Sequence, residues 1–168
     1  VSNRYSVEAL EELYAGMRLA CEKYGVDLVG GDTTSSKGGM FISITVIGDV
    51  EKEKVVKRSG AKMHDLICVS GDLGAAYAGL LVLQREKAAW LANPKMQPEL
   101  QEYEYVVGRQ LKPEAGKRTI DFLEQNSIIP TSMIDISDGL ASEMLHICKQ
   151  SDVGCEIYID RLPIDYRT

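Results

Sequence analysis

The stretch Ile134-Asp135-Ile136-Ser137-Asp138-Gly139-Leu140 joins an apolar, β-branched run to a run of helical periodicity. The pattern predicts a strand over 132–137 that gives way, at an Asp-Gly turn, to a helix over 139–149. Strands that alternate with helices along a chain are typical of mixed α/β proteins. We therefore predict an α+β (mixed α/β) fold.

The same alternation continues on both sides of this stretch. Apolar spacing predicts further helices over 7–24, 75–86, 99–110 and 113–126. Short β-branched or apolar runs predict further strands over 26–29, 40–50, 64–70 and 155–159. Ser6 is a suitable N-cap for the first helix, and Gly25 a suitable stop. The charged segment 51–57 separates the first elements from the rest, so we expect a domain boundary near Val50.

Composition excludes several classes of protein. The 168 residues carry 19 Lys+Arg against 25 Asp+Glu, a net charge of -6, which argues against a protein that binds nucleic-acid backbones. No apolar run is long enough to span a membrane. The chain begins with Val1 rather than Met, so we expect a trimmed or incomplete polypeptide. Its four cysteines form no C-x-x-C pair and are expected to be buried, reduced thiols in a cytoplasmic protein.

Asp135 and Asp138 are candidate metal ligands. Asp135 and Ser137 share one face of the predicted strand, and Asp138 falls at the turn, where it could cap the following helix. A cap explains one aspartate but not a second carboxylate three residues earlier at the end of an apolar strand, where an unpaired charge is costly. A cation between the two carboxylates would relieve their repulsion, so we favour metal binding.

Two other segments are candidates for binding phosphate. The glycines of Val29-Gly30-Gly31-Asp32-Thr33 let a ligand approach the backbone, and Asp32 offers an oxygen to Mg²⁺, although a simple Gly-Gly-Asp turn is the alternative. Arg58 can engage two phosphate oxygens, although a solvated basic stretch is equally compatible with its neighbours. Ser70-Gly71-Asp72-Leu73-Gly74 is a weak phosphate motif, because the small residues that follow equally let a helix pack close to a strand. His64 and His146 are isolated and are interpreted as structural or surface residues.

Taken in order, these motifs resemble one family. The motifs are V-G-G-D-T-T-S at 29–35, R-S-G-A-K-x-x-D-x-I-x-V-S-G-x-x-G-x-x-x-A-G-L at 58–80, L-K-P at 111–113, I-D-I-S-D-G-L at 134–140 and I-x-x-x-x-L-P at 157–163. They resemble the thiamine-monophosphate kinases, which belong to the superfamily of aminoimidazole ribonucleotide synthetase and selenophosphate synthetase. The resemblance runs from about Tyr14 to Pro163.

The resemblance implies a two-lobed fold like that of aminoimidazole ribonucleotide synthetase, incomplete at both ends. Residues 1–50 would be a remnant of the N-terminal, dimer-forming ATP-binding lobe, and residues 51–168 the first part of the C-terminal α/β lobe. The chain departs from the family at Lys112-Pro113-Glu114-Ala115-Gly116, where relatives often show R-P-x-P-R. It also lacks the family's N-terminal acidic segment and part of its substrate pocket.

The resemblance also implies an activity: Mg²⁺-assisted phosphoryl transfer from ATP to thiamine monophosphate, giving thiamine diphosphate, by a cytoplasmic homodimer. Several Mg²⁺ ions would be held by Asp32, Asp135 and Asp138. ATP would be bound by Tyr14, Gly31, Asp32, Arg58 and Ser137, with no separate catalytic residue. Another ATP-using synthetase of the superfamily and a non-catalytic nucleotide-binding module are the alternatives, and the 168 residues alone are expected to be inactive. We expect no nucleic-acid or membrane partner.

Overall fold

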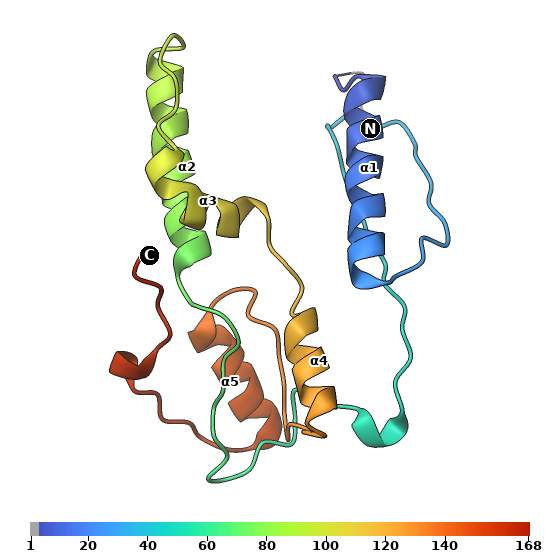
Figure 1. Cartoon of the computed structure of the whole chain (residues 1–168), viewed down its shortest axis with the longest axis vertical. Coiled ribbons are helices and arrows are strands. Elements are labelled where there is room, and N and C mark those ends of the chain that lie inside the picture. Colours follow the sequence, from blue (N-terminus) through green and yellow to red (C-terminus); the bar gives the residue numbers. More distant parts are fainter. Residues whose placement is uncertain (1–3) are drawn as a thin grey trace. The chain divides into compact units, whose positions relative to one another are not determined.

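The computed structural model describes residues 4–168, which contain five α-helices and three short 3-10 helices (Figure 1). The α-helices are α1 (Val7–Tyr24), α2 (Ala75–Ala92), α3 (Glu104–Leu111), α4 (Lys117–Gln125) and α5 (Leu140–Ser151). The 3-10 helices are η1 (Lys52–Lys54), η2 (Gln101–Tyr103) and η3 (Ile159–Arg161). The chain divides into two compact units, Val1–Val50 (unit 1) and Glu51–Thr168 (unit 2).

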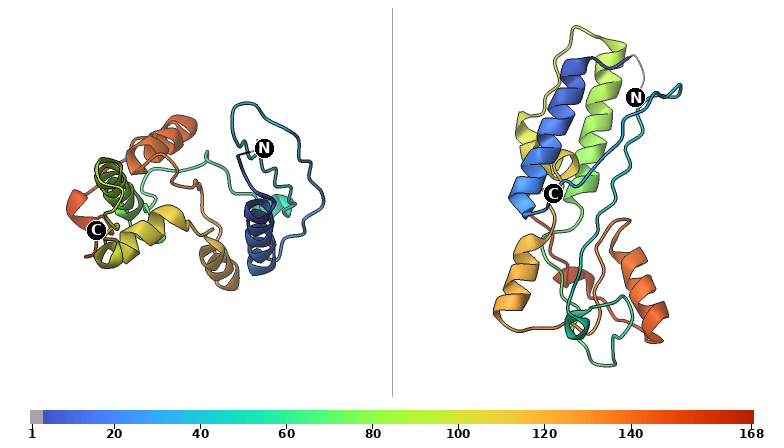
Figure 2. Two further views of the ribbon diagram at one scale, coloured as in Figure 1. Left: turned by 90° about the horizontal axis from the view of Figure 1, so that it is seen from above. Right: turned by 90° about the vertical axis from the view of Figure 1, so that its right-hand side faces the viewer.

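The predicted strands are not observed: residues 4–168 contain no strand, so the structure does not confirm the α+β prediction. The predicted segments run as unpaired coil, as the chain between α1 and η1 shows in Figure 2. A strand exists only when a second backbone pairs with it, and here no such partner is present. Many apolar side chains of these segments are consequently exposed, at 81% for Phe41 and 90% for Leu66.

The predicted helices, by contrast, are present: α1 has its predicted bounds, and the others have shifted ends. Ser6 caps α1 by accepting a hydrogen bond from the Ala9 N–H at 3.2 Å, and Gly25 ends the helix with a φ of 66°. Helix α2 continues six residues beyond its predicted end at Glu86. Helix α4 begins at Lys117 rather than at Pro113. These helices form where sequence predicts them because their signals are local.

The core of unit 2 lies where α2 packs against α3 (Figure 1). Ala75 of α2 and Val106 and Val107 of α3 are buried, and Met144 of α5 is the other buried apolar side chain in the described residues. Gly79 makes the close approach of the helices possible, because a Cβ at this position would overlap the Val106 carbonyl oxygen. The small residues of α2 therefore serve helix packing, as one reading of the sequence proposed, with α3 rather than a strand as the partner.

An apolar hollow lies at the C-terminal end of α2, lined by residues that include Trp90, Met96, Pro98 and Leu100. The segment after α2 is tied back to the helix because Glu86 Oε2 accepts the Glu99 N–H at 3.1 Å. None of the helices in the described part of the chain is long and apolar enough to cross a bilayer.

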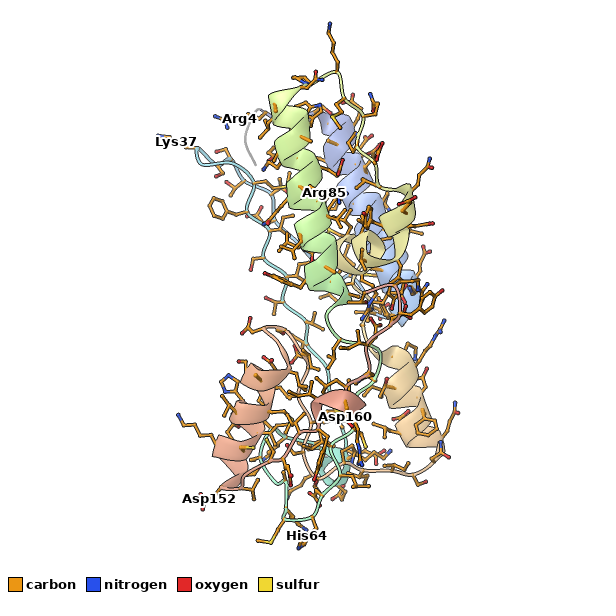
Figure 3. All side chains as sticks on the ribbon, turned by 90° about the vertical axis from the view of Figure 1, so that its left-hand side faces the viewer. Arg4, Lys37, His64, Arg85, Asp152 and Asp160 are labelled. Carbon is orange, nitrogen blue, oxygen red and sulfur yellow. The ribbon has the colours of Figure 1, made fainter. Side chains whose placement is uncertain are left out.

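The surface of unit 2 carries both histidines, which are exposed, in agreement with their interpretation as surface residues. Figure 3 labels His64 at a turn and Asp152 at the end of α5; both adopt positive φ, 73° and 55°. The expectation of buried cysteines is wrong: Cys68 and Cys155 are exposed, and Cys21 and Cys148 are only partly buried. Cys68 lies in the segment 64–70, which was predicted as a strand and runs as coil. The thiol would be buried only if this segment were part of a sheet.

Candidate functional site

In unit 1, Tyr14 lies beside the glycine-rich loop. The Tyr14 and Thr33 hydroxyls share a hydrogen bond of 2.6 Å, which joins α1 to the residue after Asp32. Gly31 and Asp32 are exposed, and a Cβ built on Gly31 would meet nothing within 4 Å. Gly31 does not adopt positive φ, so no turn requires glycine there. Tyr14 therefore lies next to the loop that carries Gly31 and Asp32, and a side chain at position 31 would have open space around it.

In unit 2, the segment with Arg58 lies alongside the segment with Asp135. The Met133 N–H donates to the Lys57 carbonyl at 2.9 Å, and the Ser132 hydroxyl donates to the Arg58 carbonyl at 2.8 Å. Two hydrogen bonds thus fix backbones that are more than 70 residues apart in sequence. The two neighbouring segments carry a cationic residue and a carboxylate, residue types that bind phosphate and Mg²⁺.

Asp135 is held as an ionised carboxylate. The Ser137 hydroxyl donates to Asp135 Oδ2 at 2.7 Å. This hydrogen bond, the Asp135 backbone N–H and the positive charge of Arg58 lower the pKa of Asp135. The carboxylate is exposed and can accept a ligand.

Asp138 does not cap α5, so the capping role considered for it is wrong. Gly139 occupies the N-cap position with a φ of 129°, and no side chain caps the helix. The Asp138 N–H instead donates to Glu143 Oε1 at 3.4 Å. Capping therefore does not account for either aspartate of the motif.

The loop that carries Arg58 is supported by residues that sequence analysis missed. Ser151 Oγ, at the end of α5, accepts the N–H groups of Gly60 and Ala61 at 3.1 and 3.2 Å. Asp65 Oδ2 accepts the Thr131 hydroxyl at 2.6 Å and the Lys62 N–H at 2.8 Å. These two hydrogen bonds, the first more strongly, lower the pKa of Asp65. The contacts of Ser151 with Gly60 and Ala61, and of Asp65 with Thr131, join residues far apart in sequence. No local sequence signal marks these supporting roles.

Gly60 is required by its conformation. Its φ is 119°, and a Cβ would lie 2.6 Å from the Thr131 carbonyl oxygen. A side chain at this position would strain the backbone and push the two segments apart.

The Ser70–Gly74 segment has a structural partner. Gly74 with a φ of 88° precedes α2, and no side chain caps this helix. Asp72 faces Arg109 of α3, with Oδ1 and Nε 3.6 Å apart. A hydrogen bond to Asp72 raises the pKa of Tyr105. These contacts tie the segment to α3, which favours the packing interpretation over a phosphate site.

The carboxylates of unit 2 suit a magnesium ion that is shared with phosphate. Within residues 4–168, no three His, Cys, Asp or Glu residues are grouped so that they could hold one metal ion. Mg²⁺ commonly takes only one or two protein carboxylates and completes its shell with phosphate oxygens and water. Exposed Asp135 and Asp138, three residues apart, fit that requirement.

Comparison with known proteins agrees with the motifs. The family profile "AIR synthase related protein, N-terminal domain" matches residues 1–50. The thiamine-monophosphate kinase of Bacillus subtilis (strain 168) is 34% identical over 165 residues, which cover 98% of this chain and 48% of the relative. The kinase of Aquifex aeolicus (strain VF5) is 34% identical over 94% of this chain and 47% of its own, and that of Escherichia coli (strain K12) is 34% identical over 83% and 39%.

No solved structure matches the chain. The chain spans about half the length of the curated relatives it matches. By sequence the chain is similar to the thiamine-monophosphate kinases over nearly its whole length, and its residues 1–50 match the N-terminal domain of AIR synthase related proteins.

Proposed function

We propose that the protein phosphorylates thiamine monophosphate. A phosphate oxygen of thiamine monophosphate attacks the γ-phosphorus of ATP, the bond from that phosphorus to the β–γ bridging oxygen breaks, and thiamine diphosphate and ADP leave. Such a reaction needs positioning and charge stabilisation more than a covalent nucleophile. The observation that carries the proposal is the hydrogen-bonded pairing of the Arg58 and Asp135 segments, which places a cationic residue and a carboxylate on neighbouring stretches of chain.

Asp135 and Asp138 in unit 2, and Asp32 in unit 1, would hold Mg²⁺. When bound, Mg²⁺ would neutralise part of the negative charge on the crowded phosphate oxygens. The Ser137 hydroxyl donates to Asp135 Oδ2 and would hold that carboxylate in one orientation for a cation. This division of roles explains why a hydroxyl and two carboxylates occur within four residues.

ATP would be bound by Gly31, Asp32 and Tyr14 in unit 1 and by Arg58 and Ser137 in unit 2. The hydrogen bond between Tyr14 and Thr33 supports a joint role for α1 and the glycine-rich loop. Arg58 would contact phosphate oxygens, because its guanidinium presents two parallel donors.

The proposal includes a homodimer that works in the cytoplasm. Segment 40–50 supports association, since Phe41, Ile44 and Ile47 are exposed and its backbone has no strand partner in the described residues. A second copy could supply that partner. Light scattering of the intact protein should give twice the monomer mass; a monomer at micromolar concentration would contradict this part of the proposal.

The activity is tested with the intact protein, ATP, Mg²⁺ and thiamine monophosphate. We expect equimolar ADP and thiamine diphosphate by chromatography, and calorimetric ATP binding that disappears when Mg²⁺ is chelated. ADP without thiamine diphosphate would identify a different ATP-using synthetase. Nucleotide binding without turnover would identify a binding module.

The isolated 168-residue polypeptide is proposed to be inactive. It corresponds to about half of the relatives' length, and phosphoryl transfer requires metals, nucleotide and acceptor to be held together. We expect weak binding of Mg·ATP and no thiamine diphosphate. Turnover by this polypeptide at the rate of the intact protein would contradict the expectation.

A further inference from the structure

Glu143 is the only charged side chain that is buried in residues 4–168, with 4% of its surface exposed. A buried carboxylate is costly unless its oxygens are satisfied. Glu143 lies in the first turn of α5, where the positive end of the helix dipole offsets part of that cost. Helix capping in its usual form is absent here, because Gly139 has no side chain to supply it.

The two oxygens of Glu143 have different surroundings. Oε1 accepts the backbone N–H of Asp138 at 3.4 Å. Oε2 is buried and has no hydrogen-bond partner among the described residues. The carboxylate therefore lies behind the Asp135–Gly139 loop and holds it by one main-chain contact. The carboxylates of Asp135 and Asp138 themselves remain at the surface.

We propose that Glu143 is a positioning residue: it fixes the backbone of Asp138 so that the Asp135 and Asp138 carboxylates are presented together to a divalent cation. The inference rests on the proposed metal-dependent function. Gly139 has a positive φ, and glycine can adopt many other backbone conformations as well. Without the contact from Glu143, the backbone at the Asp138–Gly139 turn would therefore be less constrained. Groups that orient metal ligands commonly change metal affinity tenfold to a hundredfold when removed, about the range expected here.

The test compares two variants of the intact protein. Glu143→Gln keeps an oxygen that can accept the Asp138 N–H, whereas Glu143→Leu has similar bulk and no acceptor. The Leu variant should raise the Mg²⁺ concentration for half-maximal ATP binding by about tenfold, while the Gln variant stays within about twofold of the wild type. ATP affinity at saturating Mg²⁺ should change little in either. Glu102→Gln, on the exposed surface of η2, is the control.

A wild-type Mg²⁺ requirement in a folded Leu variant would overturn the proposal, and so would equal shifts in the Leu and Gln variants. If the Leu variant does not fold, amide hydrogen exchange of the wild-type protein decides: the Asp138 N–H should be protected, and exchange at the unprotected rate overturns the contact. Failure of the proposed function is distinct, because the wild type would then bind ATP without any Mg²⁺ requirement.

Discussion

Unit 1 and unit 2 differ in how much of their surface they bury. No described residue of unit 1 is buried, and α1 has no buried side chain. Unit 2 buries Ala75, Val106, Val107 and Met144, which come from three helices. Helix pairs can bury side chains against each other, whereas a lone helix with unpaired extended segments cannot. The candidate site residues of unit 2 lie on segments that long-range hydrogen bonds join to one another and to α5, whereas in unit 1 one hydroxyl pair joins α1 to the glycine-rich loop.

The largest expected effect concerns the carboxylates of the two units. Asp138→Asn in unit 2 and Asp32→Asn in unit 1 should each lower turnover of the intact protein on the order of a hundredfold, because a misplaced phosphate costs about that much. Rates of thiamine diphosphate formation measure the effect, with Glu102→Gln as the unaffected control. If only the unit 2 variant loses activity, the unit 1 residues have no part in catalysis.

Glycine substitutions test the difference in packing directly. Gly79→Ala would place a Cβ against the Val106 carbonyl and should destabilise the protein by about 1–3 kcal/mol. Gly16→Ala, in the middle of α1 with open space around it, should stabilise by about 0.5–1 kcal/mol. Urea unfolding provides both values. A Gly79→Ala variant as stable as the wild type would show that α2 and α3 do not approach closely.

Two loop glycines separate structure from ligand contact. Gly60→Ala should reduce stability by about 1–3 kcal/mol through backbone strain, and should weaken ATP binding because the Arg58 loop shifts. Gly31→Ala has room for its methyl group and should weaken ATP binding with unfolding unchanged. Calorimetry and urea unfolding on both variants distinguish the roles. Unchanged ATP affinity in Gly31→Ala removes that glycine from the nucleotide site.

The smallest effect is a pH dependence in unit 2. Hydrogen bonds from Arg167, by its side chain and then its backbone, lower the pKa of Asp165 to about 2 from an ordinary 3.8. The folded-state pKa is depressed, so the stabilisation is complete above about pH 4 and is lost as pH falls towards 2. Urea unfolding between pH 2 and 5 should show a shallower loss of stability for Asp165→Asn than for the wild type. Identical slopes would mean that this exposed pair contributes nothing.

How far the sequence predicts the structure depends on whether the signal is local. The Ser6 and Gly25 signals placed α1 at its observed bounds, because each acts within a few residues of the helix end. The segment 40–50 has a clear strand pattern, yet a strand requires a partner that the pattern cannot supply. The domain assignments of 1–50 and 51–168 as kinase lobes stay predictions.

The same reasoning applies to the candidate site. Its residue types were readable from the motifs, and the roles assigned to them stay predictions. The approach of the Arg58 segment to the Asp135 segment depends on hydrogen bonds between residues far apart in sequence, which no spacing rule reveals. Burial of Glu143 was also missed, although an acidic residue in the first turn of a helix was a usable signal.

The position of Trp90 has a practical consequence for spectroscopy. It is the chain's single tryptophan, lies at the end of α2 and is about half exposed. Its fluorescence therefore reports on unit 2, whereas far-ultraviolet circular dichroism also sees α1 in unit 1. If the two units melt separately, the fluorescence and circular dichroism transitions will have different midpoints. The part of the ellipticity that is lost without a change in tryptophan emission then measures the melting of α1.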